Sequence, residues 1–462
     1  MSQETPFMSQ ETKAPTRRQF IQTASTTLAA FGVAPGILTG AGNGPLSERL
    51  NVAFIGAGGR GASNLRAFKK ENVNIVAFAD VDDRRGAPKA YEEFPKAERF
   101  RDFRKMLDNL EKSIDAVVVS TPDHTHAVAC LDAISRGKHV YCEKPLAHSI
   151  FELRALARAA REKGVVTQLG NQGHSYDSIR QLVEWVRDGA IGKVHTVHAS
   201  AAIVHNRIDD LPRRSEKHAL PEGLDWDLWL GPAAYRDYHP MYMPSTWRAW
   251  RPFGGGTIGD WVCHVLDGSF WALDLGAPES VTALKTEGYD PIAHADTFPR
   301  SSVLHFVFPA KGDRDAVDVY WYDGTERLPR PRELEADRES PKVGAALVGT
   351  GGTILHGSHG SREVRLIPEA RMQSYKQPDP SIPRVKGGHR SDFVQAIVGG
   401  TKAGSDFAAY GAPLTEVALL GLIAQRFPGR RLTWDSENMR FTDCKEANLL
   451  VSPPQRKGWE IT

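Results

Sequence analysis

The segment that decides the fold reads LNVAFIG at residues 50–56 and continues as AGGRGASNLRAFKK at residues 57–70. The apolar first part predicts a buried strand, the glycines predict a turn, and the remainder predicts a helix. Gly56, Gly58 and Gly61 form G-x-G-x-x-G in the strand–turn–helix context of dinucleotide-binding domains. There the first glycine allows a tight turn, the second lets the backbone approach a pyrophosphate, and the third lets the helix pack closely. The segment therefore predicts a Rossmann domain.

A second predicted strand, NIVAFAD, ends on Asp80, about 20 residues beyond the last motif glycine, where an acidic side chain accepts hydrogen bonds from the adenosine ribose. This position favours NAD, although Arg84 and Arg85 follow and leave NADP open. Further strands are predicted at IDAVVVSTP, KHVYCEKP and VVTQLGNQ, with helices at residues 124–136 and 149–163 between them. This alternation predicts a doubly wound parallel sheet.

Loops at the carboxyl ends of parallel strands converge on one crevice, where ligands bind. Here those loops are GAGGRG, the turn after Asp80, STPDH, CEKP and GNQGH. The predicted cofactor-binding residues are Gly56, Gly58, Gly59, Arg60, Gly61, Asp80, Thr121, Pro122, His126, Glu143, Lys144 and Gln172.

Four motifs together resemble the glucose-fructose oxidoreductase and inositol 2-dehydrogenase family. They are GAGGRG, STPDHTHA, YCEKPLAHS and GGGTIGDWVCHVLD, and the resemblance covers roughly residues 50–450. It implies an N-terminal Rossmann domain and a C-terminal α+β domain, whose open, mostly antiparallel sheet serves substrate binding and oligomer contacts. A homo-oligomer, dimer or tetramer, is therefore expected.

The same resemblance implies that Lys144, in the E-K-P motif, lies beside the nicotinamide and the reacting carbinol. An ammonium there would polarise the substrate oxygen. Asp260 and His264 match the family's D-x-x-x-H pair, and residues four apart share one face of a helix. His264 is the candidate base, with the neighbouring carboxylate holding or tuning it. The alternative is structural: Asp260 as a helix cap and His264 as an interior histidine.

The fold class predicted for the chain is α/β, with the Rossmann domain at residues 42–175 and the α+β domain at residues 176–445, before a C-terminal tail at 446–462. The stretches KVHTVHASAAI, SSVLHFVFP and AVDVYWY follow one another without the regular helices of the first half, which indicates antiparallel pairing.

An insertion at residues 206–253 is rich in Trp, Tyr, His, Pro and Arg. Aromatic faces beside Arg and His donors suit a pyranose, which has an apolar face and a hydroxyl edge. The predicted substrate-contacting residues are His174, Trp247, Trp250, Arg251, Asp260 and His264. Ordinary packing against the sheet remains open for each aromatic residue.

The N-terminal residues 1–41 resemble a twin-arginine export signal, with Arg17, Arg18 and Phe20 before a mild apolar run at residues 27–34. We therefore expect a periplasmic or otherwise exported protein. MSQET occurs at residues 1–5 and again at 8–12, so the start is Met1 or Met8.

Composition favours a soluble protein with a small polar partner. Among 462 residues, 58 Lys and Arg and 56 Asp and Glu leave a net charge of +2, which gives no footprint for nucleic acid, and no membrane span is expected. The four cysteines stand singly and are expected to be buried thiols. His124 and His126 lack further ligands nearby, and no metal is expected.

Three functions remain open. The first is hydride transfer between a ring carbinol of a sugar or glycoside and NAD or NADP, possibly giving a 3-keto sugar. Export favours a tightly held, internally recycled cofactor. The second is an NAD-dependent glycosidase that uses transient oxidation, elimination and re-reduction. It needs a tyrosine and histidine loop, for which Tyr235, Tyr238 and His239 are candidates. The third is a non-catalytic sugar sensor.

Overall fold

The structure, a computed structural model, describes residues 49–461. The predicted export signal at residues 1–41 and the predicted domain start at residue 42 lie outside the described residues. The helices, strands, contacts and cavities described below all belong to residues 49–461.

The first sheet has six parallel strands in the order β3-β2-β1-β4-β5-β6, as a doubly wound fold requires. Its strands are β1 (Leu50–Ile55), β2 (Val73–Ala79), β3 (Glu98–Phe100), β4 (Ala116–Val119), β5 (His139–Cys142) and β6 (Thr167–Leu169). Every pair is parallel, so all six carboxyl ends meet at one edge. The predicted Rossmann sheet is confirmed.

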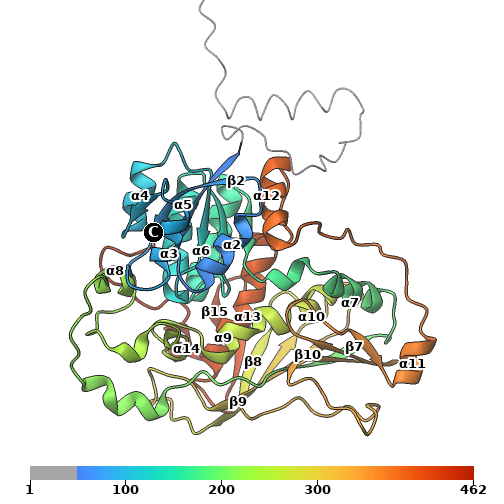
Figure 1. The fold of residues 1–462 in the computed structure, drawn as a ribbon. Helices are drawn as coiled ribbons and strands as arrows, with labels where there is room; N and C mark the ends of the chain where they lie inside the picture. The colour runs from blue at the N-terminus through green and yellow to red at the C-terminus, as the bar shows by residue number, and fades with distance from the viewer. Residues whose placement is uncertain (1–48, 462) are drawn as a thin grey trace, which may run out of the picture. The chain divides into compact units, whose positions relative to one another are not determined.

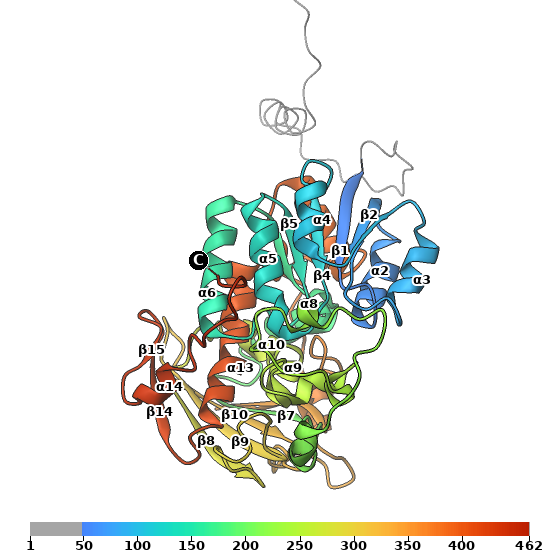
Figure 2. The same cartoon turned by 90° about the vertical axis from the view of Figure 1, so that its left-hand side faces the viewer.

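Helices cover both faces of this sheet (Figure 2). One face carries α4 (Phe103–Asn109), α5 (His126–Ser135) and α6 (Ile150–Lys163), and the other carries α2 (Arg60–Phe68) and α3 (Ala87–Glu93). Val117 and Val119 of β4 point to the first face, whereas Ala116 and Val118 point to the second. Apolar residues on both sides of a strand are what a sheet buried between two helical layers requires.

The second sheet has nine strands in the order β13-β12-β11-β7-β10-β9-β8-β14-β15. They are β7 (Val194–Ala201), β8 (Ser280–Glu287), β9 (Ser301–Phe308), β10 (Val317–Asp323), β11 (Val343–Gly349), β12 (Gly352–Gly357), β13 (Arg365–Ile367), β14 (Arg431–Asp435) and β15 (Arg440–Phe441). Among these only β10 and β7 pair in parallel. The mostly antiparallel sheet, and with it the predicted fold class, is confirmed.

Two helices lie between the sheets and join their cores: α9 (Gly256–Val265) and α13 (Ala412–Ala424) (Figure 1). The α9 helix packs on β7 and β11, while α13 packs on β8 and on α6 of the first layer. The helices α7 (Asp177–Arg187) and α10 (Asp267–Ala272) pack together beside them. This arrangement places α9 next to the carboxyl-end edge of the first sheet.

Two C-terminal segments return to the Rossmann layers. The helix α12 (His389–Gly399) places Phe393 and Val394 in the core beneath α2. In the tail, Trp459 packs against Phe103, with Arg104 over its ring. Both segments are far away in sequence, so the cofactor-binding layers are completed by the end of the chain.

The insertion predicted at residues 206–253 folds into short turns. They are η4 (Ile208–Ser215), α8 (Trp226–Leu230), η5 (Pro240–Tyr242) and η6 (Thr246–Ala249). The remaining short elements are η2 (Asp123–Thr125), η3 (Gln172–Ser175), α11 (Glu369–Ser374), η7 (Phe407–Gly411) and α14 (Lys445–Asn448). Aromatic side chains of the insertion form a core of their own, in which Trp226 stacks on Trp229 at 4.7 Å between ring centroids.

Among the described residues, one helical stretch, Phe407–Ala424, is apolar and long enough to cross a membrane by composition alone. Within this structure 78% of it is buried, as expected of a core helix between two sheets. The four cysteines are free and buried, as predicted.

Candidate active site

A cavity of about 510 Å³ lies at the carboxyl ends of β1, β2 and β4. Its walls include the motif residues Gly56, Gly58 and Gly59, and also Asp80 and Thr121. The insertion and the tail close it on the other side through Leu228, Trp229, Trp247 and Trp459. The cavity therefore follows the edge at which a Rossmann fold binds its dinucleotide.

The first turn of α2 fits a pyrophosphate. Among residues 49–461 no side chain caps this turn, and it carries no acidic residue, so its N–H groups remain available to an anion. A Cβ atom on Gly61 would lie 2.0 Å from the carbonyl oxygen of Gly56, so only glycine allows the helix to start this close to the strand. The residues present therefore fit a dinucleotide.

Asp80 holds the position expected of the ribose acceptor. Its carboxylate accepts the N–H groups of Ala57 at 2.8 Å and Asp82 at 3.0 Å, and it lines the cavity. Burial raises its pKa above the usual value. Of the two arginines that left NADP open, Arg84 is held by Asp82 at 2.7 Å, whereas Arg85 lines the cavity.

A second, smaller cavity of about 220 Å³ continues from the first, and we call it the chamber. The two cavities share Arg60, Ser120, Thr121, Trp247 and Arg248. The rest of the chamber is lined by Asp123, His126, Glu143, Lys144, Gln172, Asp260, His264 and His359. It therefore unites loops of the Rossmann edge with the face of α9 that carries Asp260 and His264.

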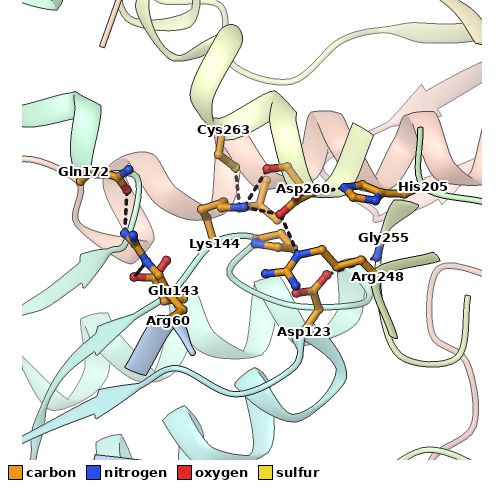
Figure 3. A network of polar contacts seen from close by, with 12 residues as sticks. Arg60, Asp123, Glu143, Lys144, Gln172, His205, Arg248, Gly255, Asp260 and Cys263 are labelled. Atoms are coloured by element: carbon orange, nitrogen blue, oxygen red, sulfur yellow. Dashed lines mark hydrogen bonds and ion pairs between the residues drawn. The ribbon is translucent and has the colours of Figure 1, made fainter. Parts of the chain in front are cut away.

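Arg60 links two other predicted cofactor residues on one side of the chamber (Figure 3). Its guanidinium pairs with Glu143 at 2.9 Å and donates to Gln172 Oε1 at 2.9 Å. Glu143 also accepts from Asn64 of α2 at 2.8 Å. On another wall, the ring nitrogens of His126 contact the carbonyl oxygens of Pro145 and Thr121, an arrangement that holds the E-K-P loop.

Lys144 and Asp260 meet directly across the chamber (Figure 3). The Lys144 ammonium donates to the Asp260 carboxylate at 2.5 Å and to the Asp260 carbonyl at 2.7 Å, and the Lys144–Pro145 peptide bond is cis. Asp260 also contacts His205 Nε2 and Arg248 Nε, each at 3.2 Å. Burial alone would raise the pKa of this carboxyl, but its three partners hold that pKa well below the usual value. Asp260 is therefore ionised.

His264 lies one turn further along α9 and also lines the chamber. Its Nδ1 is buried and has no hydrogen-bond partner among the described residues. Instead its ring stacks on His359, with centroids 3.9 Å apart and planes inclined by 20°. Burial lowers the pKa of His264 well below its usual value, and the charge of Lys144 lowers it further. The imidazole is therefore neutral and able to accept a proton.

Arg248 and Asp123 complete the charged groups of the chamber. Asp123 Oδ2 accepts the N–H of Gly255 at 3.2 Å, and burial raises its pKa to about 7 against the opposing effect of Arg248. Beyond Asp260, a third cavity of about 600 Å³ is lined by His205, Asn206, Ser245, Thr246 and Trp261 among others, and it shares Arg248 with both other cavities. Arg248 therefore stands where the three cavities join.

Comparison with known families agrees with this arrangement. Two models of the Gfo/Idh/MocA oxidoreductase family match the chain: the NAD-binding Rossmann fold at residues 50–171 and the C-terminal alpha/beta domain at residues 178–291. Together they match just over half of the chain. The chain belongs to this family. Its cofactor domain is thus an NAD-binding Rossmann domain.

Two curated relatives show how far the likeness extends. Inositol 2-dehydrogenase of Rubrobacter xylanophilus is 38% identical over 32% of this chain and 42% of its own length. Glycosyl hydrolase family 109 protein 2 of Akkermansia muciniphila is 31% identical over 36% of each. In each case the match spans less than half of the relative.

Solved structures of the same architecture extend the likeness in fold to most of the chain. The aldose-aldose oxidoreductase from Caulobacter crescentus, complexed with glycerol, aligns with a TM-score of 0.57 at 17% identity. That alignment covers 84% of this chain and all of the other.

Three of the predicted substrate residues lie away from the three cavities. His174 is buried, with Nδ1 3.0 Å from Asp267 and its ring stacked on Trp271. Trp250 is fully buried among the aromatic residues of the insertion and donates to the Met241 carbonyl. Arg251 lines a separate cavity of about 280 Å³. Their placement does not support substrate contact, whereas Trp247 lines both the dinucleotide cavity and the chamber.

The sequence analysis missed Ser120, Asp123, Arg248 and His359 of the chamber, and His205 of the third cavity. Asp123 and Arg248 stood inside stretches singled out for other residues, STPDHTHA and the aromatic insertion. His359 stands in HGSHGSRE, whose serines and glycines indicate only a turn. Asp260 does not hold His264 by a hydrogen bond, since the hydrogen bonds and ion pairs of this carboxylate go to Lys144, His205 and Arg248. Its negative charge does act on His264, whose pKa it raises against the larger effect of burial.

Proposed function

We propose that this protein is an NAD-dependent oxidoreductase that moves a hydride between the dinucleotide and a ring carbinol of a sugar or glycoside. One observation carries the proposal: an ammonium, an ionised carboxylate and a neutral, unpartnered imidazole meet in a chamber that continues from the dinucleotide cavity. The name of the inositol 2-dehydrogenase relative supports a polyol or sugar substrate.

The proposed roles follow from the contacts of each side chain. The Lys144 ammonium, held by Asp260, donates to the carbinol oxygen and stabilises negative charge as it develops there. The neutral His264 imidazole takes the hydroxyl proton. The cofactor, when bound, accepts the hydrogen of the carbinol carbon together with its electron pair. Asp260 keeps its negative charge throughout and so orients Lys144.

The enclosure of the cavity supports a tightly held cofactor. Trp229 of the insertion and Trp459 of the tail close the cavity opposite the glycine turn. We propose NAD as that cofactor because the Asp80 carboxylate stands where a 2′-phosphate would be repelled. Acid release of nucleotide from the purified protein tests retention, and identification of the released nucleotide as NADP would contradict the choice of NAD.

The sugar proposal is tested with the purified mature protein and a panel of monosaccharides and methyl glycosides, following NADH absorbance. We expect Lys144→Met and His264→Ala to lower kcat/KM by about 100-fold or more, as loss of a general acid–base or oxyanion-stabilising group does. Lys163→Met and His195→Ala are matched controls, because both residues are exposed and line none of the three cavities. Full activity of Lys144→Met and His264→Ala would contradict the catalytic roles proposed for Lys144 and His264.

A second candidate is a glycosidase that oxidises the ring transiently, eliminates the aglycone, adds water and re-reduces the ring. The likeness to a family 109 glycosyl hydrolase favours it. Against it, Tyr235, Tyr238 and His239 line none of the three cavities, and Tyr235 is 69% exposed. Aglycone release from p-nitrophenyl glycosides without net NADH would establish the glycosidase and exclude simple dehydrogenation.

We also propose export and self-association. The Arg17-Arg18 pair and the apolar run after it support a twin-arginine signal. An N-terminus near residue 42 on periplasmic material is the expected result, and a full-length cytoplasmic protein would contradict export.

The outer face of the second sheet, where His198, Tyr320 and His305 stack, supports a dimer or tetramer. A monomer in light scattering at micromolar concentration would contradict assembly.

A further inference from the structure

The loop between β12 and β13 reaches the chamber from a distant part of the sequence. In this loop His359, Ser361 and Glu363 have φ angles of 53°, 55° and 57°, and Gly360 lies between the first two at 83°. Side chains with a Cβ rarely adopt this left-handed conformation, and it persists only where the surroundings impose it. The loop, which we call the left-handed turn (residues 358–363), is therefore held from outside.

Contacts from three other segments hold the left-handed turn. A Cβ on Gly360 would lie 2.3 Å from the carbonyl oxygen of Gly173, so the two backbones are in direct contact. Ser178 of α7 donates to the Gly360 carbonyl at 2.6 Å. A Cβ on Gly268 of α10 would lie 2.0 Å from the Ser361 hydroxyl. These contacts leave the turn little freedom and fix the position of the residue at its tip, His359.

His359 contacts His264 through both its backbone and its side chain. Its N–H donates to the His264 carbonyl at 2.8 Å, and its ring stacks on the His264 ring at 3.9 Å. Ser358 Oγ lies 2.9 Å from His359 Nδ1 and so restrains the ring. Trp261 stands edge-on to both histidines, at 5.9 Å from His264 and 5.6 Å from His359. The rings of His264 and His359 therefore pack together against α9.

A histidine that transfers protons is usually oriented through its second nitrogen, by a carboxylate or a carbonyl. Among the described residues His264 has no such partner, and Asp260 on the same helix is committed to Lys144, Arg248 and His205. Stacking is the contact that remains to set the plane of the His264 ring.

We propose that His359 is a positioning residue for His264: held by the left-handed turn, its ring fixes the plane of the His264 imidazole and keeps water off one of its faces. This inference rests on the proposed function, in which His264 accepts the hydroxyl proton. The charged groups around the pair are Lys144 from the E-K-P loop, Arg60 from α2, Asp260 from α9 and Arg362 from the turn itself.

The test compares variants that keep or remove the stacked ring in the full-length holoenzyme. His359→Phe keeps a flat ring, whereas His359→Ala removes it, and both place a Cβ at the same strained position. His359→Asn also lacks the ring and tolerates a left-handed backbone, so it serves if the alanine variant does not fold. Thermal unfolding verifies that each variant is native.

We expect the Ala and Asn variants to lose about tenfold or more in kcat/KM at neutral pH, the size of a partial loss of general base catalysis. The acidic limb of their kcat/KM–pH profile should move to higher pH, towards the ordinary histidine range, because water reaches His264 and relieves its burial. The Phe variant should stay within about threefold of the wild type with an unchanged limb. A Phe variant as damaged as the Ala variant, or an Ala variant with an unshifted limb, would overturn the proposal.

A readout without turnover separates this inference from the proposed function. In protein labelled with ¹³C-histidine, the titration of His264 is followed by NMR and assigned with His264→Ala. An upward shift of that titration in His359→Asn but not in His359→Phe supports positioning, even if no sugar reduces NAD. If the titration is the same in all three proteins while sugars are oxidised, the positioning role fails and the proposed function stands.

Discussion

Two Trp-Arg dipeptides stand three residues apart in the insertion, and the structure uses them differently. Trp247 is buried at the edge of the aromatic core and also lines the chamber, as does Arg248, which stands at the junction of all three cavities. Trp250 and Arg251 point away from the chamber. The Trp250 indole packs in the aromatic core, and the Arg251 guanidinium donates to the Leu422 carbonyl. Identical residue pairs in one segment therefore divide between the site and its support.

The backbone explains the division. The 3₁₀ turn η6 ends at Ala249, and Trp250 is already extended at φ −112° and ψ 116°. In a continued 3₁₀ helix, residues three apart would share a face, and the second pair would have followed the first into the chamber. A change of direction between the two pairs sends Trp250 into the core instead. The end of η6 therefore decides which of the two tryptophans lines the chamber.

Truncation of the two tryptophans is expected to give the largest contrast. Trp250→Ala removes a fully buried side chain and should lower the free energy of unfolding by about 3–5 kcal/mol. Trp247→Ala opens onto an existing cavity, so we expect a loss of about 1–2 kcal/mol together with a raised KM. Urea unfolding at fixed cofactor concentration measures both losses. Equal losses would show that Trp247 stabilises the fold as much as Trp250 does and would break the comparison.

The two arginines should differ next, in activity. Arg248→Met deprives Asp260 of one of its partners and removes a cation from the chamber, so kcat/KM should fall by about 100-fold. Arg251→Met leaves the chamber intact and should keep kcat/KM within about threefold for folded protein, although three acceptors lose a donor. Steady-state rates on one sugar, normalised to native protein, decide between them. An inactive but folded Arg251→Met enzyme would move that residue into the site.

The same division explains how much the sequence could predict. The Rossmann half follows local rules, because a glycine turn, an acidic strand end and alternating elements each lie within a few dozen residues. Lys144, Asp260 and His264 are predicted through the resemblance of their motifs to the family, and the structure brings all three to the chamber. Their partners were not identified: His205 reaches Asp260 from the end of β7, and His359 comes from a turn beyond β12. Such contacts depend on how distant strands pair, which no local pattern encodes.

The smallest expected effect concerns Asp123, whose pKa is raised by burial and lowered by the nearby charge of Arg248, the arginine of the first dipeptide. Its folded pKa, about 7, lies above the unfolded value near ~3.9. The folded state therefore holds a proton that the unfolded chain releases, and this contribution to stability is present at low pH and is lost as the pH rises from ~4 through about 7. Asp123→Asn removes the titrating carboxyl group, so its stability should not show this decrease as the pH rises.

Full linkage over such a shift corresponds to ~4 kcal/mol, and the adjoining cavities admit water that relieves part of it. We therefore expect the free energy of unfolding of Asp123→Asn to change less than that of the wild type between pH 5 and pH 8, by about 1–2 kcal/mol. Asp313→Asn, at an exposed carboxylate, is the matched control. In Arg248→Met the loss of stability due to Asp123 should occur at higher pH than in the wild type, because a cation that lowers the Asp123 pKa is gone. In Arg251→Met this loss should occur at the same pH as in the wild type. Parallel curves for Asp123→Asn and the wild type would mean that Asp123 is ionised throughout, and Arg248 would then act on Asp260 alone.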